Sequence, residues 1–201
     1  MTQPMAIELI GALKRGRRKT IGPLHLQVPK GYIVALVGPN GSGKSTMMQL
    51  IQQMLQPDAG EIRWFGQSCS GELPLELRQQ IGYVSEAPEP EENYMTAERA
   101  AEFRSQWYPT WDQQLFEDLM NRFDVPRNER LNRMSKGERR KYEIAAALAA
   151  RPKLLLLDEP SSGLDPFAWK GMIDELRDFM EGEDMTILIA THIVEEVKRL
   201  A

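Results

Sequence analysis

Cysteine is almost absent from this sequence, and its scarcity excludes one class of protein. Cys69 is the single cysteine among 201 residues. The chain therefore cannot form an internal disulfide framework of the kind that stabilises small secreted domains. Chains without disulfides are typical of reducing compartments, and we expect this protein in the cytoplasm.

Long apolar runs and targeting signals are missing as well. The longest uncharged apolar stretch is Ile144–Ala150, far below the roughly 18 residues of a membrane-spanning helix. The N-terminal residues lack the charged, apolar and small-residue regions of a secretory signal. Work at a membrane would therefore require a membrane-embedded partner.

The chain also lacks an excess of positive charge. The formal net charge is −4, from 25 Lys and Arg against 29 Asp and Glu. Such a balance gives no general basic face, and we expect no nucleic-acid partner. The length suits one domain, with room for a subdomain, and no internal repeat is visible.

One glycine-rich segment predicts a phosphate site. It follows the apolar run Ile33–Val37 and fits G-x-x-x-x-G-K-[ST], which is a P-loop between a strand and a helix. Backbone N–H groups of such a loop surround a polyphosphate, Lys44 reaches its outer phosphates, and the Ser45 hydroxyl takes one Mg²⁺ position. The alternative is a glycine-rich turn that binds nothing. The loop residues are Gly38, Pro39, Asn40, Gly41, Ser42, Gly43, Lys44, Ser45 and Thr46.

A second motif adds two acids at the end of a buried strand. Leu154–Leu157 is followed by Asp158 and Glu159. Two acids at this place can have different roles. Asp158 can support Mg²⁺ through a water, and Glu159 can polarise the water that attacks the outer phosphate. The alternative is a strand that ends in a solvated acidic turn.

The distribution of apolar residues predicts an α/β fold. Short apolar runs between helical patterns indicate a mainly parallel sheet, at Ile33–Val37, Ile81–Val84, Leu154–Leu157 and Thr186–Ala190. An antiparallel N-terminal edge sheet is expected at Met5–Ile10, Leu24–Val28 and Glu61–Phe65. We expect one domain, in which residues 1–86 and 151–201 form the core with its edge sheet and 87–150 form an inserted helical subdomain.

Two local patterns stand out within the helical segment. Thr110-x-x-Gln113 fits a capping box and predicts a helix start. The segment also contains Trp107, Tyr108 and Trp111, and the stripe of Leu115, Leu119 and Phe123 on one helix face is interpreted as core rather than as a ligand platform.

Three further motifs lead to a family resemblance. They are the signature segment Met134–Glu138, the D-loop Ser161–Pro166 and the pair Thr191-His192. With the P-loop and the acid pair, they stand in the order and spacing of ATP-binding cassette (ABC) ATPases, which the chain resembles over nearly its whole length. A weaker similarity, resting on Trp107–Asp112 and the Ser-Lys-Gly signature, is to a bacterial exporter-type branch with YtrB-like subunits.

The resemblance implies a P-loop NTPase core that binds ATP and Mg²⁺. Glu159 would be the general base, and His192 would contact the γ-phosphate. Ser135 and Gly137 would face ATP held by a second subunit, in a homodimer or heterodimer, and Asp165 would lie at that interface. The implied activity is ATP hydrolysis that closes and opens the dimer and powers a transporter, with export favoured. A transmembrane permease would then hold the protein at the inner face of the membrane.

The sequence departs from the family in the signature segment and in the loop after Ile81–Val84. Lys136 and Glu138 replace a usual glycine and glutamine, and the added cation of Lys136 could assist phosphate binding. Glu86 replaces a glutamine that reaches Mg²⁺ and the attacking water. The functional interpretation places Glu86 at the metal, with the rest of the acidic segment Ser85–Glu92 receiving a basic permease helix. The alternative is a solvated acidic loop.

A third departure concerns the nucleotide base. The family's adenine-stacking aromatic is missing from Leu13–Lys19. The guanidinium of Arg15 can replace it, because a planar cation stacks on a ring. A solvated basic loop is the alternative.

Two other functions compete with transport. A regulatory cassette would bind ATP with little hydrolysis, as Glu86, Lys136 and Glu138 could indicate. A non-transport ATPase acting on DNA or the ribosome is disfavoured by the acidic charge and by the lack of a long coiled coil or a second cassette. The chain ends nine residues after His192, where the resemblance implies a further strand and helix, as expected of a fragment.

Overall fold

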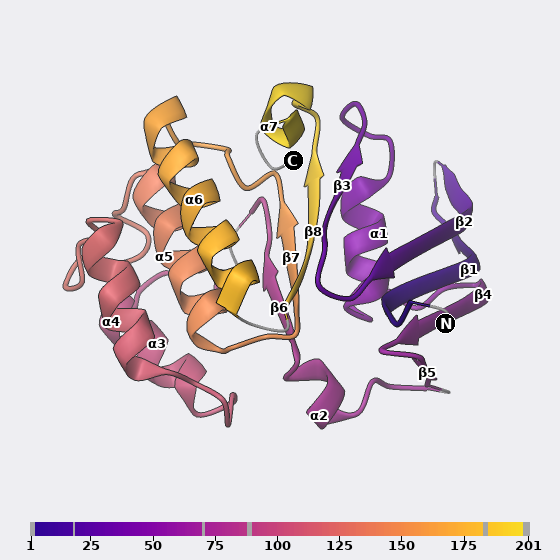
Figure 1. Cartoon of the computed structure of the whole chain (residues 1–201), viewed down its shortest axis with the longest axis horizontal. Coiled ribbons are helices and arrows are strands. Elements are labelled where there is room, and N and C mark those ends of the chain that lie inside the picture. Colours follow the sequence, from indigo (N-terminus) through magenta and orange to yellow (C-terminus); the bar gives the residue numbers. More distant parts are fainter. Residues whose placement is uncertain (1–2, 18, 70, 88–89, 183–184, 199–201) are drawn as a thin grey trace.

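The computed structural model describes residues 3–17, 19–69, 71–87, 90–182 and 185–198. These residues form two sheets of four strands each, with helices between and outside them (Figure 1). One sheet is parallel, in the order β3-β8-β7-β6, and the other is antiparallel, in the order β2-β1-β4-β5. The expected α/β class, with an antiparallel N-terminal sheet beside a parallel one, is confirmed.

The parallel sheet consists of the four strands that the apolar runs predicted. They are β3 (Ile33–Val37), β6 (Ile81–Val84), β7 (Leu154–Asp158) and β8 (Thr186–Thr191). Every residue of β7 and β8 is buried. Strands covered on both faces consist of continuous apolar residues, and this is why the sequence located them well. Because the strands are parallel, their carboxyl ends meet at one edge of the sheet.

The helices follow the strands or lie between them in the chain. The segment expected to be mainly helical contains α3, α4 and α5, whereas its proposed bounds at 87 and 150 stay a prediction. The helices are α1 (Lys44–Ile51), α2 (Leu75–Arg78), α3 (Ala97–Ser105), α4 (Gln113–Arg122), α5 (Lys136–Ala149), α6 (Pro166–Gly182) and α7 (Val194–Lys198).

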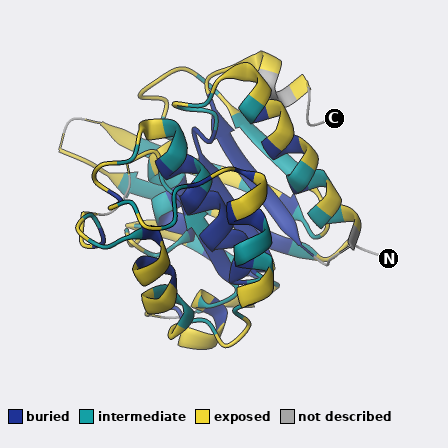
Figure 2. Ribbon diagram, turned by 90° about the vertical axis from the view of Figure 1, so that its left-hand side faces the viewer, coloured by how far each residue is buried: buried dark blue, intermediate teal, exposed yellow. Residues whose placement is uncertain are grey.

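The parallel sheet separates two hydrophobic cores. Leu154 and Leu156 of β7 pack with α1 and the antiparallel sheet. Leu155 and Leu157 point the other way and pack with α3, α4, α5 and α6. Successive side chains of a strand face opposite sides, so one short strand contributes to both cores. Figure 2 shows the buried strands enclosed by helices whose outer faces are exposed.

The antiparallel sheet extends further than predicted. Its strands are β1 (Met5–Arg15), β2 (Thr20–Pro29), β4 (Ala59–Trp64) and the short β5 (Gln67–Ser68), which the sequence did not predict. Most of the basic window Leu13–Lys19 belongs to or adjoins the β1–β2 hairpin, in which Arg15 pairs with Thr20. Arg18 lies outside the described residues.

Of two local predictions in the helical segment, the helix cap is wrong and the core stripe is confirmed. Helix α4 is capped by Asp112, whose carboxylate accepts the N–H of Leu115 at 2.9 Å. Thr110, the expected cap, instead donates its hydroxyl to the carbonyl of Ala150 at 2.6 Å. Leu119 and Phe123 are buried and Leu115 packs against the same core, whereas Trp107 is 57% exposed. The error at Thr110 comes from a tertiary contact that a local pattern does not contain.

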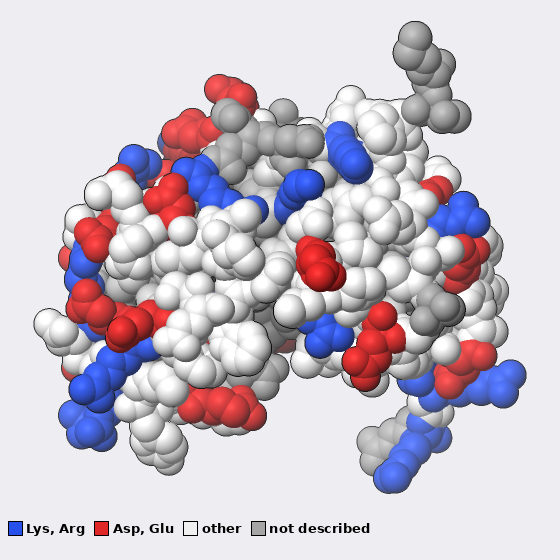
Figure 3. All heavy atoms as spheres, turned by 90° about the horizontal axis from the view of Figure 1, so that it is seen from below, with Lys and Arg blue, Asp and Glu red and all other residues white. Residues whose placement is uncertain are grey.

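The surface carries charges of both signs. Figure 3 shows Lys, Arg, Asp and Glu side chains interspersed around a broad uncharged area on one face. None of the helices in the described part of the chain is long and apolar enough to cross a membrane.

Candidate functional site

The P-loop connects the end of β3 to the start of α1, at the carboxyl edge of the parallel sheet. Gly41 and Gly43 have φ angles of 77° and 105°, which side chains with a Cβ rarely adopt. The loop therefore requires glycine at both places. Gly43 precedes α1 without any side-chain cap, so no side chain occupies the N–H groups of the first turn. These groups are free to bind an anion.

The Lys44 side chain folds back over its own loop. Its Nζ donates to the carbonyl of Gly38 at 2.7 Å and to that of Pro39 at 3.3 Å. The same Nζ lies 3.4 Å from Oε1 of Glu159, and the Lys44 side chain is only 10% exposed. The ammonium is thus directed over the loop, where a bound polyphosphate would lie.

Glu159 follows β7, and its carboxylate lies between the Lys44 ammonium and the His192 ring. Its φ of 47° is in the left-handed region, and its N–H donates to the carbonyl of Ala190 at 2.8 Å. Oε2 lies 2.8 Å from Nδ1 of His192, while Oε1 faces Lys44. Neighbouring parallel strands thus bring Lys44, Glu159 and His192 together from distant parts of the sequence.

Asp158, the last residue of β7, is buried and incompletely satisfied. It is 2% exposed, and its Oδ1 has no hydrogen-bond partner among the described residues. Burial raises the pKa of the Asp158 carboxyl, the Ser45 hydroxyl opposes this in part, and Glu159 and Glu86 raise the pKa further. An unpaired buried carboxylate oxygen is costly unless a ligand satisfies it.

Glu86 lines a cavity together with Asp158 and Ser45. The cavity measures about 230 Å³ and also contains Gln49 and Ser85. Arg140 of α5 holds the backbone nearby, donating to the carbonyls of Ser85 at 2.7 Å and Glu86 at 3.1 Å. Glu86 itself is exposed. The structure thus places the three expected metal residues around one cavity.

The donor set suits a magnesium ion that is shared with phosphates. No group of three or more His, Cys, Asp or Glu side chains that could hold a metal occurs within the described ranges. The oxygens of Ser45 and Asp158 are nevertheless the hard ligands that Mg²⁺ prefers, and Mg²⁺ commonly uses one or two protein ligands plus substrate phosphates. The orphaned Oδ1 of Asp158 fits this arrangement.

The signature segment starts α5 with a capping box. The Ser135 hydroxyl accepts the N–H of Glu138 at 3.2 Å, and the Ser135 N–H donates to the Glu138 carboxylate at 2.8 Å. Glu138 therefore has a local structural role. Gly137 is required by a close approach, because a Cβ there would lie 2.7 Å from the carbonyl oxygen of Gly163. Helix α5 packs on β6, at the opposite edge of the parallel sheet from β3 and its P-loop (Figure 1).

Asp165 is the N-terminal cap of α6. One of its carboxylate oxygens accepts the N–H groups of Phe167 at 2.9 Å and Ala168 at 3.0 Å. These hydrogen bonds lower the pKa of the Asp165 carboxyl. Asp165 is exposed, so a capping role and a place at an interface are compatible.

The β1–β2 hairpin contacts the P-loop through residues that the sequence did not single out. Lys19 donates from Nζ to the carbonyl of Gly41 at 3.2 Å. Ile21 packs against Gly43, where a Cβ would lie 3.0 Å from its side chain. Arg15 is exposed, and its N–H donates to the Asp58 carboxylate at 2.6 Å. The basic run 14–19 was the only signal for Lys19.

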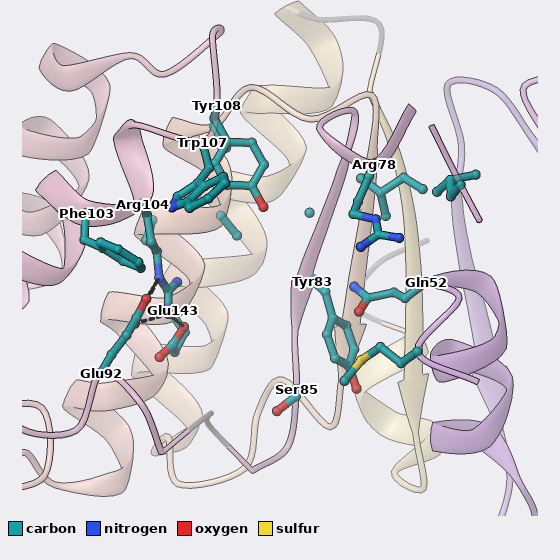
Figure 4. Close-up of a pocket in the computed structure, with 17 residues that line it drawn as sticks. Gln52, Arg78, Tyr83, Ser85, Glu92, Phe103, Arg104, Trp107, Tyr108 and Glu143 are labelled. Atoms are coloured by element: carbon teal, nitrogen blue, oxygen red, sulfur yellow. Dashed lines mark hydrogen bonds and ion pairs between the residues drawn. The ribbon is translucent and has the colours of Figure 1, made fainter. Parts of the chain in front are cut away.

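A groove is lined by residues at the end of α1, in β6 and in helices α3 and α5 of the helical segment. It has a volume of about 450 Å³. Its floor holds Arg104, whose guanidinium lies 2.6 Å from the Glu92 carboxylate and 2.7 Å from that of Glu143 (Figure 4). Figure 4 also shows an aromatic wall facing residues of the core, with Phe103, Trp107 and Tyr108 on one side and Gln52, Arg78 and Tyr83 on the other.

The acids of the segment Ser85–Glu92 do not form one solvated loop. Glu92 is buried and paired with Arg104, so the expectation that it is open to a basic helix is wrong. Glu86 and Glu91 are exposed. Pro88 and Glu89 lie outside the described residues.

Comparison with known proteins agrees with this arrangement. A family model described as "ABC transporter" matches residues 21–162. The ABC transporter ATP-binding protein YtrB of Bacillus subtilis (strain 168) is 32% identical over 87% of this chain and 59% of its own length. Nod factor export ATP-binding protein I of Rhizobium leguminosarum bv. viciae is 34% identical over 98% of this chain and 64% of its own length.

A solved structure agrees in fold as well. It is described as the ATP-binding subunit of an ABC transporter and superposes with a TM-score of 0.85 at 26% identity, covering 98% of this chain and 83% of that one. The chain spans about six tenths of the length of the two curated relatives, at 59% and 64%.

Proposed function

Because the chain belongs to the ABC transporter family of ATP-binding proteins, we propose that it hydrolyses ATP and thereby powers a membrane transporter. The observation that carries this proposal is the convergence of Lys44, Glu159 and His192 within hydrogen-bond and ion-pair distance beside the P-loop. A cradle for phosphates, a carboxylate base and a group that orients the base are the parts that phosphoryl transfer to water requires.

The proposed chemistry begins with the release of Lys44. In the free protein its ammonium contacts Gly38 and Glu159. A triphosphate in the loop offers stronger, charge-assisted partners, so Lys44 turns to the phosphates and Oε1 of Glu159 becomes available to a water. His192 holds the other oxygen of Glu159 at 2.8 Å and thereby fixes the direction of the base. His192 would also contact the γ-phosphate.

We propose that ATP binds with Mg²⁺, with the Ser45 hydroxyl as a ligand, Asp158 supporting the ion through a water and Glu86 beside them. The ion supplies positive charge that neutralises the phosphate oxygens. The orphaned oxygen of Asp158 and its place in a cavity with Ser45 and Glu86 support this assignment.

The proposed working unit is a dimer, either homo- or heterodimeric, that encloses ATP between its subunits. Ser135 and Gly137 start α5, which packs at the far edge of the sheet from the P-loop of the same chain. A second subunit can bring these residues to the nucleotide, and Asp165, exposed on the D-loop, would lie between the subunits.

We propose a transmembrane permease as the other partner, seated in the groove of about 450 Å³. The protein would then lie at the inner face of the cell membrane. Glu92 and Glu143 are neutralised by Arg104 on the groove floor, whereas Trp107 and Phe103 are exposed. An apolar contact with a permease helix is therefore favoured over a strongly basic one. Export is the proposed direction, supported by the relative named for Nod factor export.

One observation favours a second candidate, a regulatory cassette that binds ATP and hydrolyses little of it. Glu86 shares the cavity of Asp158 and Ser45, and an additional carboxylate beside a phosphate opposes phosphate binding.

A steady-state assay of phosphate release decides between the two candidates. For a hydrolase we expect turnover that Glu159→Gln reduces about 10²-fold or more, since a positioned base contributes roughly 10²–10⁴. Lys153→Ala, an exposed lysine away from the site, serves as the control. Tight ATP binding with negligible turnover in the unaltered protein would favour the regulatory candidate.

A further inference from the structure

The start of α5 and the D-loop touch through a residue that the family resemblance does not explain. Lys136, the first residue of α5, donates from Nζ to the hydroxyl of Ser162 at 2.6 Å. Its aliphatic stem covers Gly163, where a Cβ would lie 2.6 Å from Cγ of Lys136. Only a glycine at 163 leaves room for the lysine, and only a glycine at 137 leaves room for the Gly163 carbonyl.

Ser162 is connected in turn to the candidate base. The N–H of Ser162 donates to the carbonyl of Glu159 at 3.0 Å, which closes a tight turn after β7. Glu159 begins this turn in a left-handed conformation, with φ at 47°. Such a conformation persists only where the surroundings hold it. Glu159, Ser162 and His192 also line one cavity of about 430 Å³, so a shift of the turn would change the position of the carboxylate.

Within the described structure, the Lys136 ammonium forms its hydrogen bond with this turn. No carboxylate lies within ion-pair distance of it in the ranges that the structure describes. The helix start does not need it either, because Ser135 and Glu138 complete the capping box. A glycine, the usual residue of the family at this position, has no side chain to reach Ser162.

We propose that Lys136 is a positioning residue for hydrolysis. Through Ser162 it holds the turn that follows Glu159 and keeps the Glu159 carboxylate beside His192, facing the P-loop. In this structure the Lys136 ammonium is engaged by Ser162, so in this proposal it acts through the turn and does not assist phosphate binding directly, and its loss affects the chemical step rather than nucleotide binding. The inference rests on the proposed ATPase function.

A double-mutant cycle tests the proposal, with kcat and KM for ATP as the readouts. We expect Lys136→Ala and Ser162→Ala each to lower kcat about tenfold, the size of effect that a small misplacement of a reacting group produces, with the ATP KM changed less than about twofold. The double variant should be no slower than either single variant, because both changes break the same contact. Lys136→Arg, which keeps a cationic donor, should retain most of the activity.

The controls separate this proposal from a folding defect and from the proposed function. Lys153→Ala should behave like the unaltered protein, and thermal melting of every variant detects loss of fold. Unchanged kcat in Lys136→Ala, additive losses in the double variant, a loss confined to Lys136→Ala, or a raised KM would each overturn the positioning role. Absence of turnover in the unaltered protein would instead refute the proposed ATPase function.

Discussion

Asp158 is buried and has a carboxylate oxygen without a hydrogen-bond partner among the described residues. Both features lower the stability of the protein without nucleotide. Its pKa is raised chiefly by burial, so the folded chain binds this proton more tightly than the unfolded chain does. Stability is therefore lost as the pH rises from the unfolded pKa through the raised folded pKa, and it stays lost above. Residues that fold at such a cost are typical of functional sites.

The first prediction follows from this sign. Without nucleotide, Asp158→Asn should melt at a higher temperature than the unaltered protein, because no charge is then buried. The difference should be small at acidic pH and grow as the pH increases. Thermal melting between about pH 4 and 8 measures it. The variant should gain less stability from ATP and Mg²⁺ than the unaltered protein does. A difference in melting temperature that is independent of pH would contradict the electrostatic explanation.

Glu86 carries the second prediction. If its carboxylate lies beside the metal, Glu86→Gln removes one negative charge from the cavity that Ser45 and Asp158 share. The Mg²⁺ concentration that supports half-maximal hydrolysis should then increase. Glu91→Gln, a change at an exposed acid of the same loop, should leave that concentration unaltered. Equal Mg²⁺ dependence in the two variants would mean that Glu86 belongs to the surface alone.

At the residue scale, the sequence singled out residues that the fold brings together, whereas it missed residues that contact them. Lys44, Asp158 and Glu159 belong to motifs whose spacing is local. Lys19 and Ser162 contact the site through the fold, and the sequence contained only a basic run for the first and a family motif for the second. Contacts between segments far apart in the chain leave no periodic pattern.

At the element scale, the β1–β2 hairpin brings basic side chains close to the P-loop. Strand β1 extends to Arg15, and the hairpin lies against the P-loop through Lys19 and Ile21. Stacking of Arg15 on adenine stays a prediction, and the exposure of Arg15 is compatible with it.

The third prediction distinguishes the roles of Arg15 and Lys19 by comparing the binding of ATP with that of inorganic triphosphate. Arg15→Ala should weaken ATP more than inorganic triphosphate, because stacking acts on the base. Lys19→Ala should weaken both ligands equally, because Lys19 supports the loop that holds the phosphates. Calorimetric titration of both variants with both ligands measures this. Equal losses for Arg15→Ala would indicate a general effect of charge.

Strands buried on both faces were predictable together with their boundaries, whereas the start of a helix was less so. The strands of the parallel sheet were predicted within one residue at either end, because burial on both faces leaves an unbroken apolar run. The start of α4 was misplaced, because Thr110 and Asp112 are both good caps and the choice depends on the Ala150 carbonyl, a distant partner of Thr110.

At the scale of the whole molecule, the order of the strands creates the site. Strands β3 and β7 are separated in sequence by more than a hundred residues and in space only by β8. All end at one edge, where ligands of parallel α/β sheets bind. The sequence predicted parallel strands but not their order, because an apolar run does not specify its neighbour. The division into a core and a helical subdomain at 87–150 remains our proposal.

The size of the nucleotide-bound protein tests the central claim most directly. The claim is that Glu159 is the base for hydrolysis in a dimer that closes around ATP. Glu159→Gln should bind ATP and fail to hydrolyse it, so the closed dimer should persist. Size-exclusion chromatography with light scattering, in ATP and Mg²⁺, should give twice the chain mass of 22.9 kDa for this variant and the single mass without nucleotide. A variant that binds ATP, stays monomeric and hydrolyses at the unaltered rate would contradict both the base and the closure.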